Sequence, residues 1–166
     1  MTSRERVVRA YNHQEPDRVP ICIGGVAQKL SKVAYHAVKA HIGIRDEYEK
    51  ESIADELDNV VYYHPKFLEH FRADFREVHV RRLLPARRFE DGSWEHELGI
   101  RLKYSSNGET VNFVSNPLRE ATLEQIERYP MPDPDDPRRF AGLREEARQL
   151  QETTTYAIGC YKATLL

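Results

Sequence analysis

A cluster of prolines near the middle of the second half restricts the fold of this chain more than any other sequence feature. Four of them fall between residues 130 and 137: Pro130, Pro132, Pro134 and Pro137. Proline lacks a backbone N–H and fixes φ, so neither a helix interior nor a central strand can run through this stretch. Residues 128–137 are therefore predicted to form a linker rich in proline and aspartate, in which Asp135 and Asp136 are placed to cap a helix that begins at Pro137.

The composition is that of one ordinary folded domain. The chain has 166 residues, of which 40% are hydrophobic, enough for a core. A net charge of -2 gives no general attraction to nucleic acid or anionic lipid. No apolar run approaches the roughly 20 residues that span a bilayer, and the N-terminus lacks the apolar core of a signal peptide. We expect a cytoplasmic protein with no nucleic-acid partner and no membrane association.

The chain contains only two cysteines, Cys22 and Cys160, far apart in the sequence. They support neither a disulfide framework nor a CxxC zinc site, which agrees with a reducing compartment. Two thiolates would be an incomplete zinc set, whereas small buried apolar side chains are the commoner role, and we favour the second interpretation. We predict no metal site within this chain.

The first half is predicted to contain helices and two buried strands. Thr2 and Glu5 have the spacing of a capping box, which predicts a helix from there to about Asn12. The short apolar segment 18–23 (RVPICI) is typical of a strand buried on both faces. Helical patterns follow at 28–41, at 46–59 and around 67–71, before an alternating strand at 75–81.

Residues 86–114 change character and predict a β-meander. Asp91-Gly92 and Asn107-Gly108 each separate two alternating arms, and both dipeptides favour type I′ turns, in which two successive residues take positive φ. Trp94 is expected to pack within the meander rather than stack on a ligand.

The remaining elements complete an α/β pattern. Thr122 and Gln125 form a second capping-box spacing, and 153–161 reads as a further buried strand. The helix that begins at Pro137 has a predicted buried stripe of Phe140, Leu143, Ala147 and Leu150. Buried strands separated by helices imply a parallel sheet, and a TIM barrel takes about 250 residues. We expect the N-terminal part of a (β/α)₈ barrel, incomplete within residues 1–166 and carrying an inserted meander.

Four segments, in order, resemble the uroporphyrinogen decarboxylase superfamily. They are TSRERVVRAYNHQEPDRVPI (2–21), FRADFREVHV (71–80), EDGSWEHELGIRLKY (90–104) and NPLREATLEQIERYPMPDPDDPRRFAGLREEARQL (116–150). The third is similar to a hairpin of the corrinoid-dependent methyltransferase branch. The resemblance implies a TIM barrel with its active site at the carboxyl ends of the strands. It also implies a tetrapyrrole-like or methylated substrate, zinc and a corrinoid in the full-length protein, a corrinoid-protein partner and a homodimer.

Two departures limit what the resemblance implies. The decarboxylase grips substrate carboxylates with an arginine-rich loop after its first strand, whereas this chain has GGVAQKLSK there, without arginine. The decarboxylase also has an essential aspartate at the end of its second strand, and this chain has Arg81 near the corresponding position. The methyltransferase zinc ligands, a His-x-Cys pair and a later cysteine, belong to the second half of the barrel.

Candidate site residues are those at predicted strand ends, where TIM-barrel chemistry is located. Gly24 and Gly25 would let a ligand approach the backbone closely, although we favour the alternative that they form a plain strand-to-helix turn. Arg81 and Arg82 are candidates for binding substrate carboxylate or phosphate. With Arg76, Arg87 and Arg88 they form a basic cluster whose alternative interpretation is a solvated face.

His79 is the candidate acid, base or ligand. It alternates with Val78 and Val80, so its alternative role is to pack against a covering helix.

Two classes of function follow. In the first, the chain is part of a tetrapyrrole- or corrinoid-linked enzyme of methyl transfer or decarboxylation, inactive without the rest of the barrel. In the second, it is a non-catalytic binding or assembly module that completes a barrel with another chain.

Overall fold

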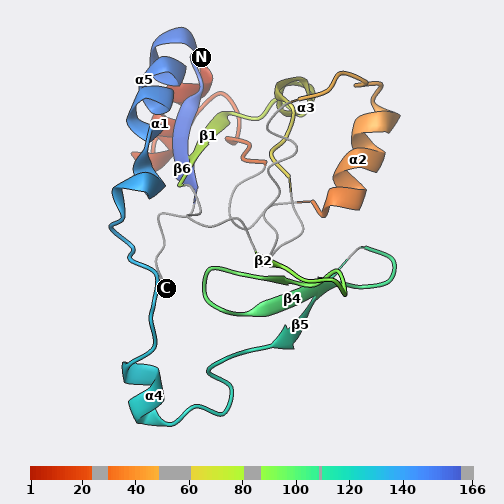
Figure 1. Cartoon of the computed structure of the whole chain (residues 1–166). Helices are drawn as coiled ribbons and strands as arrows, with labels where there is room; N and C mark the ends of the chain where they lie inside the picture. Colours follow the sequence, from red (N-terminus) through yellow and green to blue (C-terminus); the bar gives the residue numbers. More distant parts are fainter. Residues whose placement is uncertain (24–29, 49–60, 81–86, 109, 162–166) are drawn as a thin grey trace.

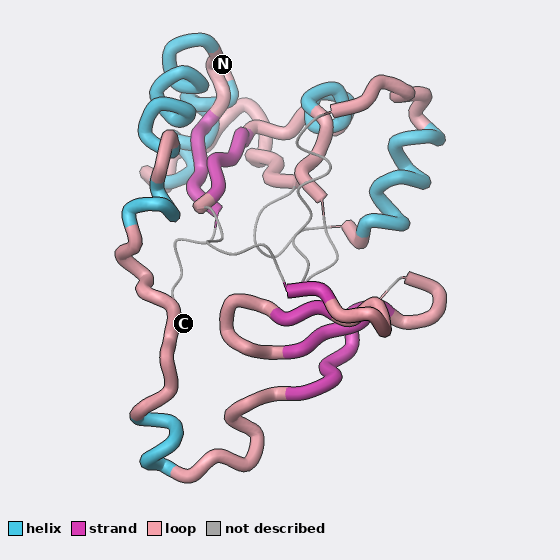
Figure 2. The backbone as a smooth tube through the Cα atoms, in the orientation of Figure 1, coloured by secondary structure: helices cyan, strands magenta, loops and turns pink. Residues whose placement is uncertain are grey.

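The structure is a computed structural model. It describes residues 1–23, 30–48, 61–80, 87–108 and 110–161 (Figures 1 and 2). None of the helices in these ranges has the length and apolar character that crossing a bilayer requires.

A pair of parallel strands joins the first half of the chain to its C-terminal part. Strand β1 (Phe75–His79) pairs with β6 (Ala157–Tyr161) in the register Phe75↔Ala157 to His79↔Tyr161. Helix α5 (Leu143–Thr153) packs against both strands, and α1 (Ser3–Tyr11) packs against β6 (Figure 1). Two of the three predicted strands are thereby confirmed as strands, but β6 is less buried than predicted, because Ala157 is buried and Cys160 is exposed. The two strands lie next to each other although 77 residues separate their last and first members (79 to 157, less one).

The third predicted strand, 18–23, is wrong. Pro20 has no N–H to give to a ladder, and the N–H of Ile21 donates to a side-chain oxygen, Asp74 Oδ2, at 2.8 Å. One backbone bond remains, from the Asp74 N–H to the Ile21 carbonyl at 2.7 Å. The segment therefore runs beside the start of β1 without forming a strand of its own.

Helices α2 (Lys32–His41) and α3 (Pro65–His70) lie on the other side of β1 (Figure 1). Each contributes a ring to a small aromatic core. Its buried members are Tyr35, Val61, Tyr63 and Phe67. The Tyr35 and Tyr63 rings stack at a centroid distance of 4.8 Å. Helix α2 starts later than predicted because Ser31 caps it. Of the predicted helix 46–59, residues 46–48 are not helical and the rest lies outside the described residues.

The predicted meander is confirmed as a four-stranded antiparallel sheet in the order β2-β3-β4-β5. The strands are β2 (Arg87–Arg88), β3 (Trp94–Glu95), β4 (Arg101–Tyr104) and β5 (Val111–Ser115). Trp94 is 1% exposed and its ring lies 4.7 Å from that of Tyr104. Trp94 thus packs the meander, as expected.

The predicted type I′ geometry of the two turns is wrong. Only the glycine of each dipeptide takes a positive φ, +79° at Gly92 and +71° at Gly108. The Gly92 N–H donates to the Phe89 carbonyl and the Phe89 N–H to the Ser93 carbonyl, at 3.0 and 2.9 Å. This is the three-residue hairpin loop in which a left-handed glycine follows an ordinary turn.

The last helix also differs from its prediction. Asp136 caps the chain at Pro137 by accepting from the Arg138 N–H, but the turn that follows is a short 3-10 helix, η2 (Pro137–Phe140). Gly142, at φ +79°, then redirects the chain into α5. This break removes Phe140 from the predicted stripe, and its side chain is exposed. Leu143, Ala147 and Leu150 share α5 but are only half-buried.

The connector between the meander and α5 contains helix α4 (Leu123–Glu127), which Thr122 and Gln125 cap as predicted. The linker after it is pinned to one turn of the meander. The Tyr129 hydroxyl donates to the Leu98 carbonyl at 2.8 Å, and Arg139 forms two hydrogen bonds to Glu97 at 3.1 and 3.3 Å. The proline-rich stretch therefore spans two fixed points at the 96–99 turn.

Candidate functional site

Of the residues predicted for a site, the structure describes His79 alone. Gly24, Gly25, Arg81 and Arg82 lie outside the described residues. His79 is the last residue of β1, at the carboxyl end of the parallel pair, where its strand partner is Tyr161.

His79 lies beside an aromatic ring and a carboxylate. The Tyr62 ring centroid is 3.9 Å from that of His79, and His79 Nε2 is 3.9 Å from Glu77 Oε2. Glu77 and His79 share one face of the strand because residues two apart point the same way. Tyr62 belongs to an irregular segment before α3, so the contact that was predicted with a covering helix is made instead with a loop residue.

A cleft of about 390 Å³ adjoins these side chains. Its walls come from the segment 61–63, α3, β1, α5 and the residues before β6. The lining includes Tyr62, Glu69, Arg76, Glu77, His79, Glu146 and Tyr156. The volume falls in the range of small-molecule sites.

The predicted basic cluster is divided by the structure. Arg87 and Arg88 are exposed on β2, as a solvated face requires. Arg76 instead is buried, and its guanidinium carbon lies 3.5 Å from the centroid of the Tyr156 ring. Arg76 is therefore part of the cleft wall.

The cysteines form no disulfide in the described part of the chain, where Cys22 is half-buried and Cys160 is exposed. The expected burial of Cys160 is wrong, because residue 160 lies on β6 but no described element covers its side chain. Within the described ranges no three His, Cys, Asp or Glu side chains come together as a metal site. These residues do not fit the zinc of the methyltransferase branch, and we assign it no position here.

Sequence reasoning missed a buried charge network at the opposite end of β1. Asp74, fully buried, accepts hydrogen bonds from Arg6 Nη1 at 2.6 Å and from Arg18 Nη1 and Nη2 at 2.7 and 2.9 Å. Arg6 also holds Asp17 through Nε and Nη2, at 2.5 and 2.8 Å. A signal was present, since three of the four residues lie in the PDR and ADF motifs of the resembling segments.

The pKa values reflect these contacts. The Arg6 hydrogen bond lowers the pKa of Asp17 to about 2. Burial acts to raise the pKa of Asp74, but hydrogen bonds from Arg18 and the Ile21 N–H outweigh it, so the pKa of Asp74 stays below its ordinary value. Both carboxylates are charged at neutral pH. The network lies just before the first residue of β1, at the end of the strand opposite His79.

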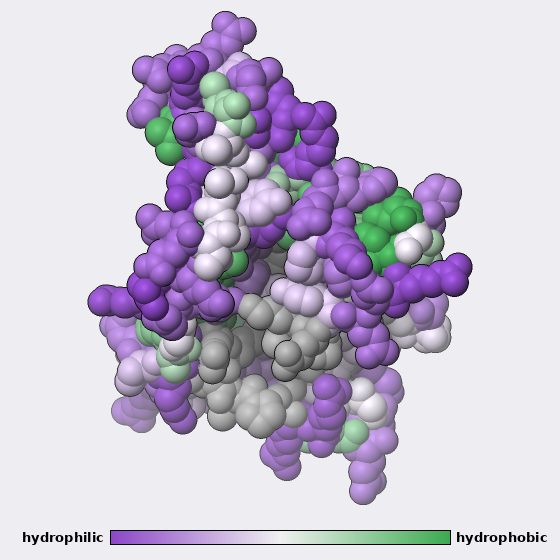
Figure 3. Space-filling model, turned by 90° about the horizontal axis from the view of Figure 1, so that it is seen from above, coloured by the Kyte–Doolittle hydropathy of each residue, from purple (hydrophilic) through white to green (hydrophobic). Residues whose placement is uncertain are grey.

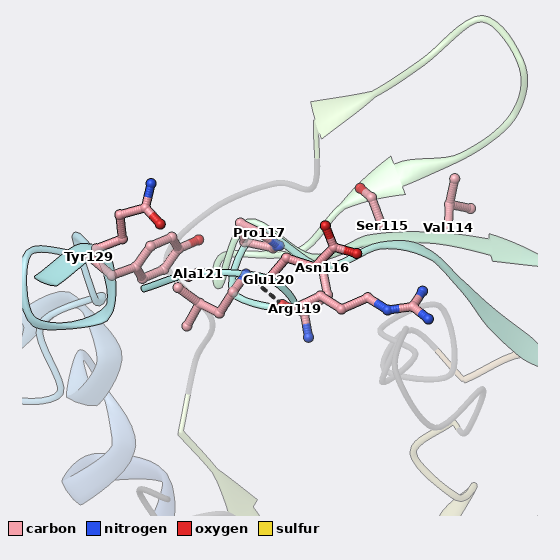
Figure 4. A pocket seen from close by; sticks show the side chains of 10 residues that line it. Val114, Ser115, Asn116, Pro117, Arg119, Glu120, Ala121 and Tyr129 are labelled. Carbon is pink, nitrogen blue, oxygen red and sulfur yellow. Dashed lines mark hydrogen bonds between the residues drawn. The ribbon is translucent and has the colours of Figure 1, made fainter. Parts of the chain in front are cut away.

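A second hollow, of about 540 Å³, lies under the turn that leads from β5 to α4. Figure 4 shows Val114 and Ser115 at one end and Tyr129 at the other. Its charged residues, Arg119 and Glu120, are exposed. Figure 3 shows a surface that is mostly hydrophilic, with separate hydrophobic patches. No buried charge faces this hollow among the described residues, so the cleft beside His79 is the better candidate site.

No protein-family model, curated protein or solved structure matches this chain. The arguments for function therefore rest on the geometry. The cleft offers an imidazole beside a carboxylate for proton transfer, and a buried guanidinium beside an aromatic ring for binding.

Proposed function

We propose that this chain forms part of a uroporphyrinogen-decarboxylase-like enzyme with a (β/α)₈ barrel. The full protein would act on a tetrapyrrole-like or methylated substrate, by decarboxylation or by corrinoid-linked methyl transfer. Within it, β1 and β6 would be neighbouring barrel strands, and the cleft beside His79 would belong to the substrate pocket.

The observation that carries the proposal is the order of three segments around Asp74. The Asp74 N–H donates to the Ile21 carbonyl, and the Asp74 carbonyl accepts from the Ala157 N–H at 2.9 Å. Residues 21, 74 and 157 therefore lie side by side in chain order. β1 and β6 are parallel and each follows a helix, as neighbouring strands of a (β/α)₈ barrel do.

The chemistry proposed for His79 is proton transfer. In a decarboxylation, the bond to the leaving carboxylate breaks, its electron pair stays on the carbon, and His79 Nε2 donates a proton to that carbon. Glu77 would stabilise the charged imidazolium form before the transfer. In the methyl-transfer variant, a bound corrinoid would supply the methyl group. His79 would then take the proton that a thiol acceptor releases.

The test uses the product of the whole reading frame that contains these residues. It is assayed for loss of carboxyl groups from uroporphyrinogen, and separately for methyl transfer from methylcobalamin to a thiol. We expect one of the two activities, lowered by about 10²-fold or more in His79→Ala. The variant Arg119→Gln, on the other hollow, should keep the activity. Absence of both activities in a folded protein would contradict the proposal.

One observation favours the second class of function. In the described part of the chain, β1 and β6 pair only with each other, and a two-stranded sheet is marginal in isolation. A strand from another chain could complete it. Mixing experiments with the remaining segments of the barrel, followed by size-exclusion chromatography, distinguish this assembly role from a role within one polypeptide.

A further inference from the structure

Arg76 is held in one orientation by its own neighbourhood. It is 9% exposed, and its Nη1 donates to the carbonyls of Phe75 at 2.8 Å and Ala73 at 3.3 Å. The guanidinium carbon lies 3.5 Å from the centre of the Tyr156 ring, a cation–π contact that suits the delocalised charge of arginine. Both contacts leave the second terminal nitrogen, Nη2, unused.

That nitrogen is buried and has no hydrogen-bond partner. Buried charged donors are costly to leave unpaired, so such a group in a folded protein calls for an explanation. In the described part of the chain no carboxylate forms an ion pair with Arg76. Glu69, which lines the same cleft, is exposed instead. Burial lowers the pKa of Arg76, although the negative charge of Glu69 acts to raise this pKa. The guanidinium nevertheless remains charged.

The geometry points to a binding site for an anionic oxygen, of a carboxylate or a phosphate group, at Arg76 Nη2 in the cleft. The inference rests on the proposed function only in taking this cleft as the ligand site. An anionic oxygen would satisfy Nη2 with a charge-assisted hydrogen bond. Tyr156 and the two carbonyls would hold the guanidinium in place before the ligand arrives.

Thermal unfolding with inorganic phosphate, and separately with tricarballylate, tests the inference. The ionic strength is held constant with NaCl. Ligands that bind only the native state raise the midpoint, and the stabilisation grows as RT ln(1 + [L]/Kd). We expect at least one of the two anions to raise the unfolding midpoint of the wild type. The matched control is Arg119→Gln, which removes an exposed guanidinium, and its midpoint should rise equally. Comparison of the two anions identifies which group the site accepts.

The variants at position 76 give the decisive comparison. Loss of one charge-assisted hydrogen bond weakens binding by about tenfold or more. Arg76→Gln should therefore bind at least tenfold more weakly, and Arg76→Lys should fall between it and the wild type. In case Arg76→Gln does not fold, the guanidinium NMR signals of Arg76 in the wild type are followed during the titration, and they should shift.

Two outcomes overturn the inference. One is unchanged midpoints and unchanged Arg76 signals with both anions. The other is equal affinity of wild type and Arg76→Gln. Either result leaves the proposed catalytic function open, because that depends on turnover by the whole protein. Conversely, anion binding without turnover would support the site and contradict the proposed reaction.

Discussion

At the scale of single residues, Asp74 joins three segments that are far apart in the sequence. Its carboxylate binds Arg6 of α1 and Arg18 and Ile21 of the following segment, while its backbone connects Ile21 with Ala157 of β6. All the acceptor positions face donors, which is how a buried charge is tolerated. Asp74 therefore helps to hold α1 against β6.

Replacement of Asp74 by asparagine should destabilise the fold by about 3 kcal/mol or more, because it leaves Arg6 and Arg18 close together without a buried counter-charge. Urea unfolding measures the effect. Asp135→Asn, at an exposed aspartate of the linker, is the control and should change the free energy of unfolding by less than about 0.5 kcal/mol. A similar small effect at both positions would contradict the structural role of the network.

The same network predicts the acid side of the stability profile. The pKa of Asp17 is about 2 in the folded chain, and an unfolded aspartate has a pKa of about 3.9. Because the folded pKa is the lower one, the stabilisation is complete above about pH 4 and is lost as the pH falls toward 2. In urea titrations, the wild type should exceed Asp17→Asn in stability at pH 6, and this difference should close between pH 4 and 2. A difference that stays constant over that range would argue against the Arg6–Asp17 contact.

At the scale of elements, the four segments that resemble the decarboxylase superfamily (2–21, 71–80, 90–104 and 116–150) are joined in two pairs. The first two meet through Arg6, Arg18 and Asp74, and the last two meet at the 96–99 turn through Tyr129 and Arg139. The proline-rich connector therefore has a defined path between the meander and α5, and this path depends on the glycine in that turn.

Gly99 is the position where this contact is most sensitive. It has φ +69°, and an added Cβ would overlap the Tyr129 hydroxyl, whereas Gly92 has φ +79° with open space around it. Gly92→Ala should cost only the backbone strain, about 1–2 kcal/mol, and Gly99→Ala should cost clearly more in thermal or urea unfolding. Adding Tyr129→Phe should recover part of the Gly99→Ala loss by removing the clashing oxygen. Equal costs at the two glycines would show that the connector does not dock at this turn.

The elements that could be predicted from the sequence are those whose signals are local. Both capping boxes, at Thr2 and Thr122, and the cap at Asp136 depend on residues at most three apart, and all three are confirmed. The strand at 18–23 failed because a distant carboxylate, Asp74, takes the N–H of Ile21. The turn type failed because Asp-Gly also suits a loop in which glycine alone is left-handed.

The candidate site was predicted only in part, because most of its contacts join residues far apart in the sequence. His79 stands at a strand end that the alternation of β1 predicts. Its neighbour Tyr62 and the other cleft tyrosine, Tyr156, come from segments that no sequence pattern connects to it. The contact of Arg76 with Tyr156 likewise joins residues 80 positions apart. This contact is what distinguishes the buried Arg76 from the exposed Arg87 and Arg88.

At the scale of the whole molecule, the central claim is that the segment at 18–23, β1 and β6 are successive members of one closed barrel. An experimental structure of the product of the whole reading frame tests it most directly. The account predicts eight parallel strands, with the segment at residues 18–23 and β6 on opposite sides of β1 and with His79 beside the ligand cleft. A self-contained sheet in which other elements cover both outer edges of β1 and β6 would contradict it.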